Sequence, residues 1–324
     1  MALKDVTTEI KKAQRIAILC HHNADLDSVC SALVLKDALV AQNKEVLVGA
    51  AESVSKNARR IVEGRGVLID PEVKDFDLIV TVDAASPEQL LPVRPDLSKT
   101  VVIDHHQPGA LAAGAKAAYV DATSKSSAQL VHAIVKDLGA VVTPEMAALL
   151  AAAIISDTNY LRFADIKTFE AVVDLLRASG KEYKDILDLT AEEIDVSERI
   201  AILRSTQRLQ TYQLGDLLVA FSTVGSFEAA VARSFLKLGA DISIVAVPRS
   251  GAVRISGRMN SKHQGRLSLV TDVFKPCEAM IGGSAGGHDG AASANGTKPE
   301  NIKRTFAEML RLLEKKTGQR AKPL

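Results

Sequence analysis

Histidine and aspartate residues gather directly after two apolar runs of the chain. The stretch 21–27, His-His-Asn-Ala-Asp-Leu-Asp, follows the run at 16–20, and the triplet at 104–106, Asp-His-His, follows the run at 101–103. A β-rich run that leads into such a loop places these side chains at the carboxyl edge of a sheet, where open α/β folds bind ligands. Imidazole and carboxylate together suit Mn²⁺ better than an all-oxygen site does. The pattern therefore predicts a divalent metal site.

Two further carboxylates stand at the ends of predicted elements. Asp83 ends the apolar run 78–82, and Asp157 follows the apolar helix predicted at 144–155. Either residue alone has an ordinary explanation as a helix cap or a turn residue. Four such clusters at the ends of strands and helices are hard to attribute to capping. We therefore interpret them together as one site.

The elements that must position these residues alternate along the first half of the chain. Strands are predicted at 15–20, 45–50, 77–82, 100–103 and 117–120. Helices are predicted at 28–41, 55–63, 126–138, 144–155 and 167–179. This alternation is typical of a mostly parallel sheet with flanking helices. We expect an α/β domain over residues 1–190.

The second half begins with a polar stretch that carries apolar side chains at helical spacing. We interpret residues 191–212 as a connector helix and 213–324 as a smaller α/β domain. Its strands are predicted at 217–222, 242–247 and 252–258, and its helices at 227–238, 267–274 and 299–316. The tail from residue 317 is expected to be frayed.

Charge is distributed unevenly between the two halves. Residues 196–324 hold 19 Lys and Arg against 10 Asp and Glu, a net charge of +9, which leaves −8 on residues 1–195. Bound cations would offset part of the acidic charge, and a basic half suits an anionic partner. Drift of surface charge between domains explains the asymmetry equally well.

The composition favours a soluble protein of a reducing compartment. The chain has 3 cysteines at unrelated spacings, which fit neither a disulfide framework nor a zinc motif. Residues 1–12 lack the apolar core of a signal peptide. The longest apolar run, 146–155, is too short to span a bilayer. We expect a cytoplasmic protein that does not associate with membranes.

Taken in order, these motifs resemble those of the DHH phosphoesterase superfamily, which is named for the triplet seen here at 104–106. The opening motif at 21–27, Asp83 and Asp157-Thr158 occur in the same order. The run 282–288, Gly-Gly-Ser-Ala-Gly-Gly-His, is similar to the glycine-rich motif of the DHH-associated substrate domain. The resemblance covers nearly the whole chain and includes nuclease, nanoRNase and pAp-phosphatase types.

The resemblance implies two divalent cations, with Mn²⁺ as the expected metal. The implied ligands of one cation are His21 and Asp25. Those of the other are Asp27, His105 and Asp157, with Asp83 bridging both. The resemblance also implies that His106 contacts the scissile phosphate and helps the leaving oxygen, while Asp104 orients an imidazole. In the C-terminal half, the implied substrate-binding residues are Arg258, Gly286, Gly287 and His288.

The leading functional hypothesis is hydrolysis of short oligonucleotides to mononucleotides, together with phosphatase action on nucleotides such as pAp. Aromatic residues make up only 4% of the chain, too few for the stacking platforms of a long single-strand channel. The sequence motif Asp-x-Asp-Ser-x-x-Ser at 25–31 resembles that of manganese pyrophosphatases, so pyrophosphatase or exopolyphosphatase activity stays an alternative. A non-catalytic replication or repair partner is a third hypothesis, and a homodimer is compatible with the sequence.

Overall fold

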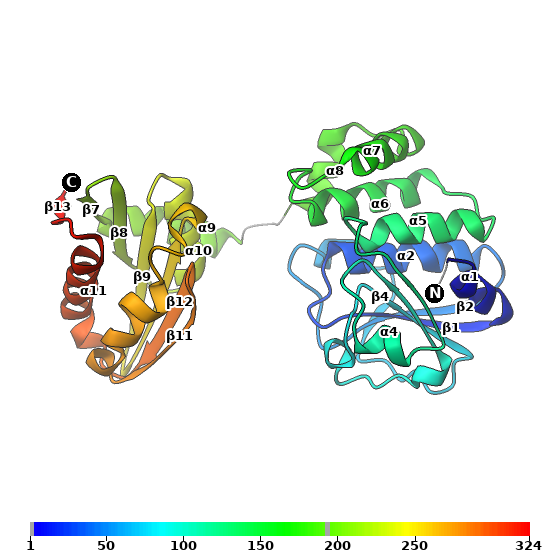
Figure 1. The fold of residues 1–324 in the computed structure, drawn as a ribbon, viewed down its shortest axis with the longest axis horizontal. Coiled ribbons are helices and arrows are strands. Elements are labelled where there is room, and N and C mark those ends of the chain that lie inside the picture. Colours follow the sequence, from blue (N-terminus) through cyan, green and yellow to red (C-terminus); the bar gives the residue numbers. More distant parts are fainter. Residues whose placement is uncertain (1–2, 192–194) are drawn as a thin grey trace. The chain divides into compact units, whose positions relative to one another are not determined.

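The computed structural model describes residues 3–191 and 195–324. The chain divides into two compact units, Met1–Glu193 and Ile194–Leu324, each built around its own sheet (Figure 1). The first unit carries an all-parallel sheet with flanking helices and the second a mixed sheet with helices. The predicted α/β class is therefore confirmed.

The N-terminal sheet has six parallel strands in the order β3-β2-β1-β4-β5-β6. They are β1 (Arg15–Cys20), β2 (Glu45–Ala50), β3 (Val67–Ile69), β4 (Leu78–Val82), β5 (Thr100–Asp104) and β6 (Ala117–Val120). The chain proceeds from β1 outward to β3, returns to β4 beside β1, and then proceeds outward in the other direction. Because the connections after β1 and β4 leave in opposite directions, a crevice opens at their carboxyl ends.

Most helices of this unit cover one face of the sheet. They are α1 (Leu3–Lys12), α2 (Leu26–Val40), α5 (Ser127–Asp137), α6 (Pro144–Asp157), α7 (Ile166–Ser179) and α8 (Tyr183–Thr190). Helix α6 packs between α2 on one side and α7 and α8 on the other (Figure 1). Residues 26–35 of α2 and 146–155 of α6 are all buried, because both helices are enclosed in this way.

The opposite face is covered by shorter pieces. They are the loops between β3 and β5, the single turns η1 (Pro87–Leu90) and η2 (Leu97–Lys99), and helix α4 (Ala110–Gly114). A further short helix, α3 (Arg59–Val62), follows β2. The unit is therefore thick on one face of the sheet and thin on the other, with the crevice at its carboxyl edge.

The C-terminal sheet has seven strands in the order β11-β12-β10-β9-β8-β7-β13. They are β7 (Gln210–Leu214), β8 (Leu217–Thr223), β9 (Ile242–Arg249), β10 (Ala252–Met259), β11 (Gly283–His288), β12 (Ala291–Gly296) and β13 (Lys322–Pro323). Only β8 and β9 pair in parallel. Helix α10 (Glu228–Lys237) packs on one face. The other face carries α11 (Ile302–Thr317), the π-helical segment η5 (Leu269–Phe274) and the 3₁₀ segment η6 (Lys275–Ile281).

Several elements differ from the sequence predictions. The helix predicted at 55–63 forms only over Arg59–Val62, and α1, α4, α8, β3, β7, β11, β12 and β13 were not predicted as elements. The tail is not frayed throughout, because Lys322 and Pro323 pair with β7. Within the expected connector at 191–212, helix α9 spans Val196–Ser205, η3 spans Thr206–Arg208, and β7 begins at Gln210. Residues 192–194 of that connector lie outside the described residues.

Candidate metal centre

The crevice at the ends of β1, β4 and β5 brings together three segments that are far apart in the sequence. His21 directly follows β1, Asp83 directly follows β4, and Asp104 is the last residue of β5, followed by His105. Asp157, the last residue of α6, comes to the same place. The geometry of parallel pairing explains this meeting, because β4 lies between β1 and β5 in register.

The first group of potential ligands consists of His21, Asp25 and Asp83, whose ligand atoms lie within 4.8 Å of one another. Nε2 of His21 is 3.8 Å from Oδ1 of Asp25 and 3.6 Å from Oδ2 of Asp83. Nδ1 of the same ring lies 2.7 Å from the carbonyl oxygen of His22. A proton on Nδ1 donates to that carbonyl, which leaves Nε2 free to bind a metal.

The second group consists of Asp27, His105 and Asp157, again within 4.8 Å. Nε2 of His105 is 3.4 Å from Oδ2 of Asp157 and 4.0 Å from Oδ2 of Asp27. The same nitrogen is 3.4 Å from Oδ1 of Asp83. Asp83 therefore presents one carboxylate oxygen to His21 and the other to His105, at the junction of the two groups.

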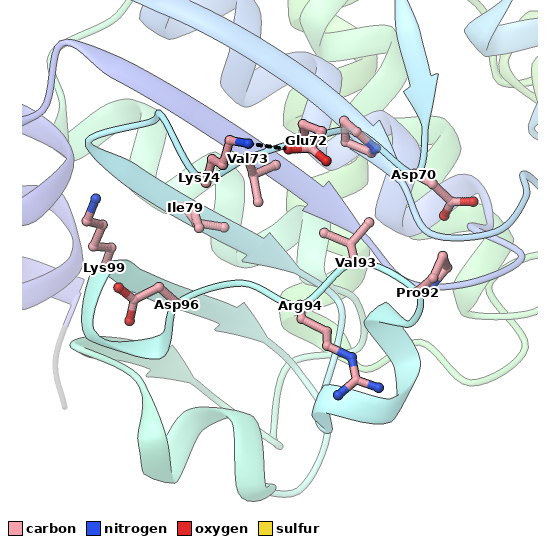
Figure 2. A pocket seen from close by; sticks show the side chains of 11 residues that line it. Asp70, Glu72, Val73, Lys74, Ile79, Pro92, Val93, Arg94, Asp96 and Lys99 are labelled. Carbon is pink, nitrogen blue, oxygen red and sulfur yellow. Dashed lines mark ion pairs between the residues drawn. The ribbon is translucent and has the colours of Figure 1, made fainter.

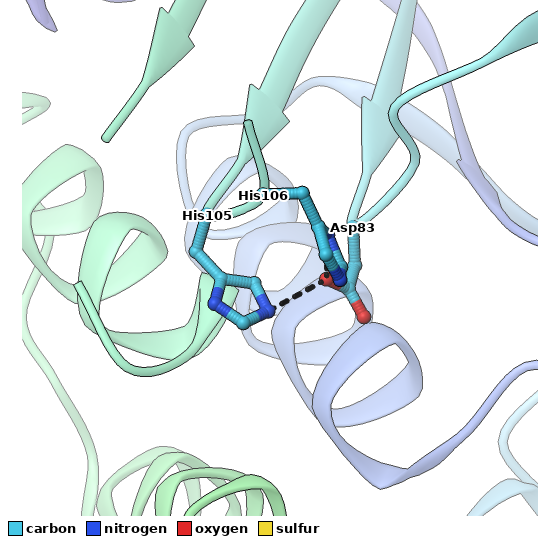
Figure 3. Close-up of side chains that lie close together, drawn as sticks. All are labelled: Asp83, His105 and His106. Atoms are coloured by element: carbon cyan, nitrogen blue, oxygen red, sulfur yellow. Dashed lines mark ion pairs between the residues drawn. The ribbon is translucent and has the colours of Figure 1, made fainter. Parts of the chain in front are cut away.

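His106 belongs to a third group with Asp83 and His105, shown in Figure 3. Its Nδ1 lies 3.6 Å from Oδ1 of Asp83 and 2.8 Å from Oδ1 of Asp104. The shorter distance is that of an Nδ1–H group donating to the buried Asp104 carboxylate. The backbone N–H of His106 also donates to this oxygen, at 3.2 Å. Asp104 thus fixes the orientation of the His106 ring.

The backbone at Asp83 is in the left-handed region, with φ of 63°. Its N–H still donates to the carbonyl of Ile103 at 2.9 Å, so the strand pairing extends to this residue. A non-glycine residue in this region carries about 1–3 kcal/mol of strain and persists only where its surroundings enforce it. Such residues concentrate at functional sites.

Groups at the N-terminus of α5 form hydrogen bonds with two of the candidate ligand carboxylates. The backbone N–H groups of Ser127 and Ala128 donate to the two oxygens of Asp27, at 2.6 and 3.0 Å. The Ser127 hydroxyl donates to Oδ1 of Asp83 at 3.0 Å. The sequence reasoning did not assign a role to Ser127. The available signal was the Ser126-Ser127 pair at the start of a predicted helix, a usual place for groups that bind a carboxylate.

The electrostatic environment of Asp157 is the opposite of that of Asp27. It occupies the carboxyl end of α6, where the helix dipole disfavours a negative charge. Burial, followed by the charges of neighbouring aspartates, raises the pKa of Asp157 to about 6, although His105 opposes the shift. A bound cation would remove this penalty.

Without bound metal, carboxylates outnumber imidazoles in the site, and this excess shifts the pKa values of its residues. Burial lowers the pKa of His21, but hydrogen bonds to Asp25 and Asp83 outweigh burial and raise it to about 10. Burial and the charges of Asp83 and Asp157 raise the pKa of Asp27 well above its usual range. The metal-free site therefore retains protons where cations would bind.

The donor set fits transition-metal cations. Five aspartates, three of them buried, meet only three imidazoles, so neutral histidines would leave several uncompensated buried charges. Burial raises the pKa of Asp83, yet hydrogen bonds from His105 and His21 outweigh burial and lower it. Divalent cations would supply the compensating charge, and mixed imidazole and carboxylate ligands suit Mn²⁺.

The predicted substrate residues lie on the edge strand β11 of the C-terminal sheet and on β10, two strands further in. Arg258 on β10 and His288 on β11 both pair with Ala291 on the intervening strand β12. Directly paired residues point to the same face of a sheet, so Arg258 and His288 share one face. Helix α10 packs on that face over β9 and β10.

The environment of Arg258 leaves its charge available. Its Nη1 donates to the carbonyl of Gly257 at 2.8 Å and to the Ser256 hydroxyl at 3.3 Å. Burial and the nearby Arg233 lower the pKa of Arg258. Arg254, four residues earlier on β10 and therefore on the same face, forms an ion pair with the buried Glu228 of α10 at 2.7 Å.

The two glycines of β11 that are predicted to bind substrate, Gly286 and Gly287, have different structural roles. A Cβ on Gly287 would lie 2.3 Å from the carbonyl oxygen of Ala291, and φ is +133° at this residue. A Cβ on Gly286 would meet no atom of the described residues within 4 Å. The backbone therefore requires glycine at 287, whereas Gly286 keeps the open face accessible.

The N-terminal unit also contains a cavity of about 440 Å³ on the thin face of its sheet (Figure 2). Three acidic and three basic residues line it, and Lys74 pairs with Glu72 at 3.2 Å. The charges of this cavity balance. It has none of the imidazole and carboxylate clustering of the crevice, so the crevice is the candidate metal centre.

Comparison with known proteins gives the family. Residues 15–154 match the model described as the DHH family, N-terminal domain. An uncharacterized protein of Methanocaldococcus jannaschii, MJ0988, is 31% identical over 319 residues, which is 95% of both chains. The chain belongs to the DHH family. The matched segment contains strands β1 to β6 and five of the six potential metal ligands; Asp157 lies just beyond it.

Other relatives and solved structures are more distant. A protein of Brevibacillus brevis named "Probable manganese-dependent inorganic pyrophosphatase" is 24% identical over 253 residues, 71% of this chain and 80% of that protein. The crystal structure of an exopolyphosphatase-related protein from Bacteroides fragilis aligns with a TM-score of 0.66 at 16% identity, covering 98% of this chain and 96% of that one. This last likeness is one of fold. No helix among the described residues has the length and apolar character needed to cross a membrane.

Proposed function

We propose that this DHH-family chain is a Mn²⁺-dependent phosphodiesterase that hydrolyses short oligonucleotides to mononucleotides and also dephosphorylates nucleotides such as pAp. The observation that carries the proposal is the position of Asp83, with one oxygen 3.6 Å from His21 and the other 3.4 Å from His105. A carboxylate placed between two ligand groups is suited to a pair of cations.

Each cation has its own ligands in this proposal. His21 and Asp25 hold one cation. Asp27, His105 and Asp157 hold the other, and Asp83 is shared. When bound, the cations lower the pKa of water and offset the charge of phosphate. The hydrogen bonds from α5 to Asp27 and Asp83 keep both carboxylates in place as the cations bind.

The two catalytic residues are His106 and Asp104. His106 is half exposed, so its Nε2 is accessible to a substrate, while its Nδ1 is held by the buried Asp104. Hydrogen bonding to Asp104 raises the pKa of His106, although burial opposes it. A protonated His106 contacts the scissile phosphate and donates a proton to the leaving oxygen.

The C-terminal residues Arg258, Gly286, Gly287 and His288 bind the rest of the substrate. Neighbouring strands are separated by about 4.8 Å, so Arg258 and His288, two strands apart, span roughly 10 Å. A span of this size exceeds a single phosphate group and suits a nucleotide or dinucleotide. This favours oligonucleotides over pyrophosphate.

Pyrophosphatase or exopolyphosphatase activity is the second candidate. It is supported by the name of the Brevibacillus brevis relative and by the Asp-Ser-x-x-Ser motif at 27–31. In the structure, Ser28 donates to the carbonyl of Val82 at 3.2 Å and so packs α2 against β4. That structural use of Ser28 weakens the sequence argument for an inorganic substrate. A non-catalytic partner is disfavoured because all six potential ligands are present.

The deciding experiment is a substrate panel with purified protein and Mn²⁺. The panel contains a dinucleotide, pAp, pyrophosphate, tripolyphosphate and a long single strand. We expect the highest kcat/KM with the dinucleotide or pAp, weaker activity with Mg²⁺, and none in EDTA. A higher kcat/KM for pyrophosphate would select the second candidate. Full activity after dialysis against EDTA would exclude both metal-dependent candidates.

A further inference from the structure

The C-terminal unit contains a cavity of about 460 Å³ that is separate from the face carrying Arg258 and His288. It lies between strands β7 and β8 and helix α11, and Arg208 of η3 also lines it. Strands β7 and β8 are near one edge of the sheet, whereas β12 and β11 form the other edge. The volume is in the range of pockets that bind small molecules.

One wall of the cavity is aromatic. Tyr212, Phe221 and Phe306 line it, with ring centroids 6.0 Å apart for the first pair and 5.0 Å for the second. Phe221 and Phe306 are buried, and Tyr212 is half-buried. A wall of this kind favours a planar aromatic group such as a nucleobase, whose π-face can pack against the rings.

The rest of the lining comes from one flank of α11, the helix that also contributes Phe306. Lys303, Ala307, Arg311 and Glu314 recur at helical spacing along this flank and all line the cavity. Ala307 is the small member of the series and lies between two long basic side chains. The space between the helix flank and the aromatic wall depends on that small side chain.

The charges at the cavity favour an anion. Three bases line it, Arg208, Lys303 and Arg311, against one acid. That acid, Glu314, accepts a hydrogen bond from the backbone N–H of Ala321 at 2.8 Å. Arg311 is paired with Glu308, but no acidic group of the described chain forms an ion pair with Lys303. Among the described residues, Arg208 donates to the carbonyl of Thr223, at 3.5 Å.

We propose that this cavity is a second nucleotide site, which binds a nucleoside monophosphate. The base packs against Tyr212 and Phe306, and the phosphate contacts Arg208 and Lys303. A plain anion would leave the aromatic wall unused, and an apolar helix from a partner would leave the basic rim unused. A nucleoside monophosphate uses both. The inference does not depend on the proposed hydrolysis, because the cavity shares no residue with the metal centre or with the Arg258 face.

The test is calorimetric titration of AMP into the full chain in EDTA, where metal-dependent turnover is absent. Wild-type protein and Arg258→Ala are both titrated, so that binding at the Arg258 face is recognised. We expect a site that survives Arg258→Ala. In the Arg258→Ala background, Lys303→Glu and Ala307→Trp should each weaken AMP binding by about tenfold or more. Lys303→Glu removes one charge-assisted contact, and Ala307→Trp fills the cavity.

The matched control is Arg304→Glu, which reverses the charge of an exposed neighbour on α11 that does not line the cavity. It should leave AMP affinity within about twofold of its background. Circular dichroism verifies folding, and Arg208→Glu replaces any variant that does not fold. Adenosine and inorganic phosphate, titrated separately, should each bind at least about tenfold more weakly than AMP.

Three results would overturn the proposal. The first is unchanged AMP affinity in both Lys303→Glu and Ala307→Trp. The second is adenosine or phosphate binding as tightly as AMP. The third is loss of all AMP binding in folded Arg258→Ala protein. A failure of the hydrolysis proposal is seen instead as absent turnover with Mn²⁺, so the two failures are distinguishable.

Discussion

At the scale of single residues, Asp83 is where most contacts of the metal centre meet. Its carboxylate lies between His21 and His105 and accepts the Ser127 hydroxyl. We expect Asp83→Asn to lower kcat by at least about 100-fold, because an amide cannot supply both negative oxygens to two cations. The fold should persist, since the amide oxygen can still accept from Ser127.

The control for Asp83→Asn is His132→Ala, on α5 and outside the three ligand groups of the described residues. It should change kcat less than about twofold. Kinetics with a dinucleotide, together with the metal content of each protein, measure both variants. Wild-type turnover by Asp83→Asn protein that still holds two metals would show that the bridging assignment is wrong.

Protonation of individual ligands gives a second prediction at this scale. With its pKa raised to about 10, His21 is protonated in the metal-free protein at pH 7, and a metal binds only the neutral ring. Mn²⁺ binding should therefore release protons, and its Kd should fall by about tenfold per pH unit per proton as pH rises from 7 to 8. Calorimetry in buffers of different ionisation enthalpy measures this release. A Kd independent of pH would contradict it.

At the scale of elements, helix ends set the charge environment of the site. Asp27 accepts from the amino end of α5, which favours a negative charge, whereas Asp157 occupies the disfavoured carboxyl end of α6. The same side-chain type thus has two electrostatic roles. Asp27 is anchored by the protein, and Asp157 depends more on a cation.

Strand β11 gives a prediction from two adjacent glycines. Gly287→Ala should destabilise the protein by about 1–3 kcal/mol, because φ is +133° and its Cβ would overlap the carbonyl of Ala291. Gly286→Ala should change stability by less than about 0.5 kcal/mol, because its Cβ would enter open space. It should instead raise KM for a dinucleotide. Thermal unfolding and kinetics of both variants test this pair, and equal destabilisation by the two would refute the distinction.

At the scale of the whole molecule, the two units carry opposite charge, −7 on residues 1–193 and +8 on 194–324. In the proposed function the acidic unit binds cations and the basic unit binds the anionic substrate. Arg258→Ala and His288→Ala should each lower kcat/KM for a dinucleotide by roughly tenfold to a hundredfold, the loss of one charge-assisted phosphate contact.

The same two variants should affect bis-p-nitrophenyl phosphate only weakly, because this small substrate lacks the distant phosphate. Arg254→Ala is the matched control on β10, since Arg254 is engaged by Glu228. Equal losses on both substrates would mean that the C-terminal residues support the metal centre, and the division of labour would be wrong. Cytoplasmic location and a homodimer stay predictions, and sedimentation equilibrium measures the oligomeric state.

The sequence alone determined the elements whose periodicity is local. The five N-terminal strands predicted from apolar runs are confirmed to within one residue, because strands buried on both faces of a parallel sheet read as continuous apolar runs. The motifs 21–27, 104–106 and Asp157 were also recognisable without a structure, since each follows such an element. Family membership followed from their order.

Only the tertiary structure decided which groups meet and which edges pair. Strands β11, β12 and β13 are poor in large apolar side chains, so only pairing with a neighbour reveals them. The role of Ser127, about 100 residues from Asp27, depends on how α5 packs behind the crevice. The cavity beside α11 likewise needs β7, which was not predicted. The reason is physical: hydrophobic periodicity is encoded by near neighbours, whereas sheet order, register and cavities arise from contacts between distant segments.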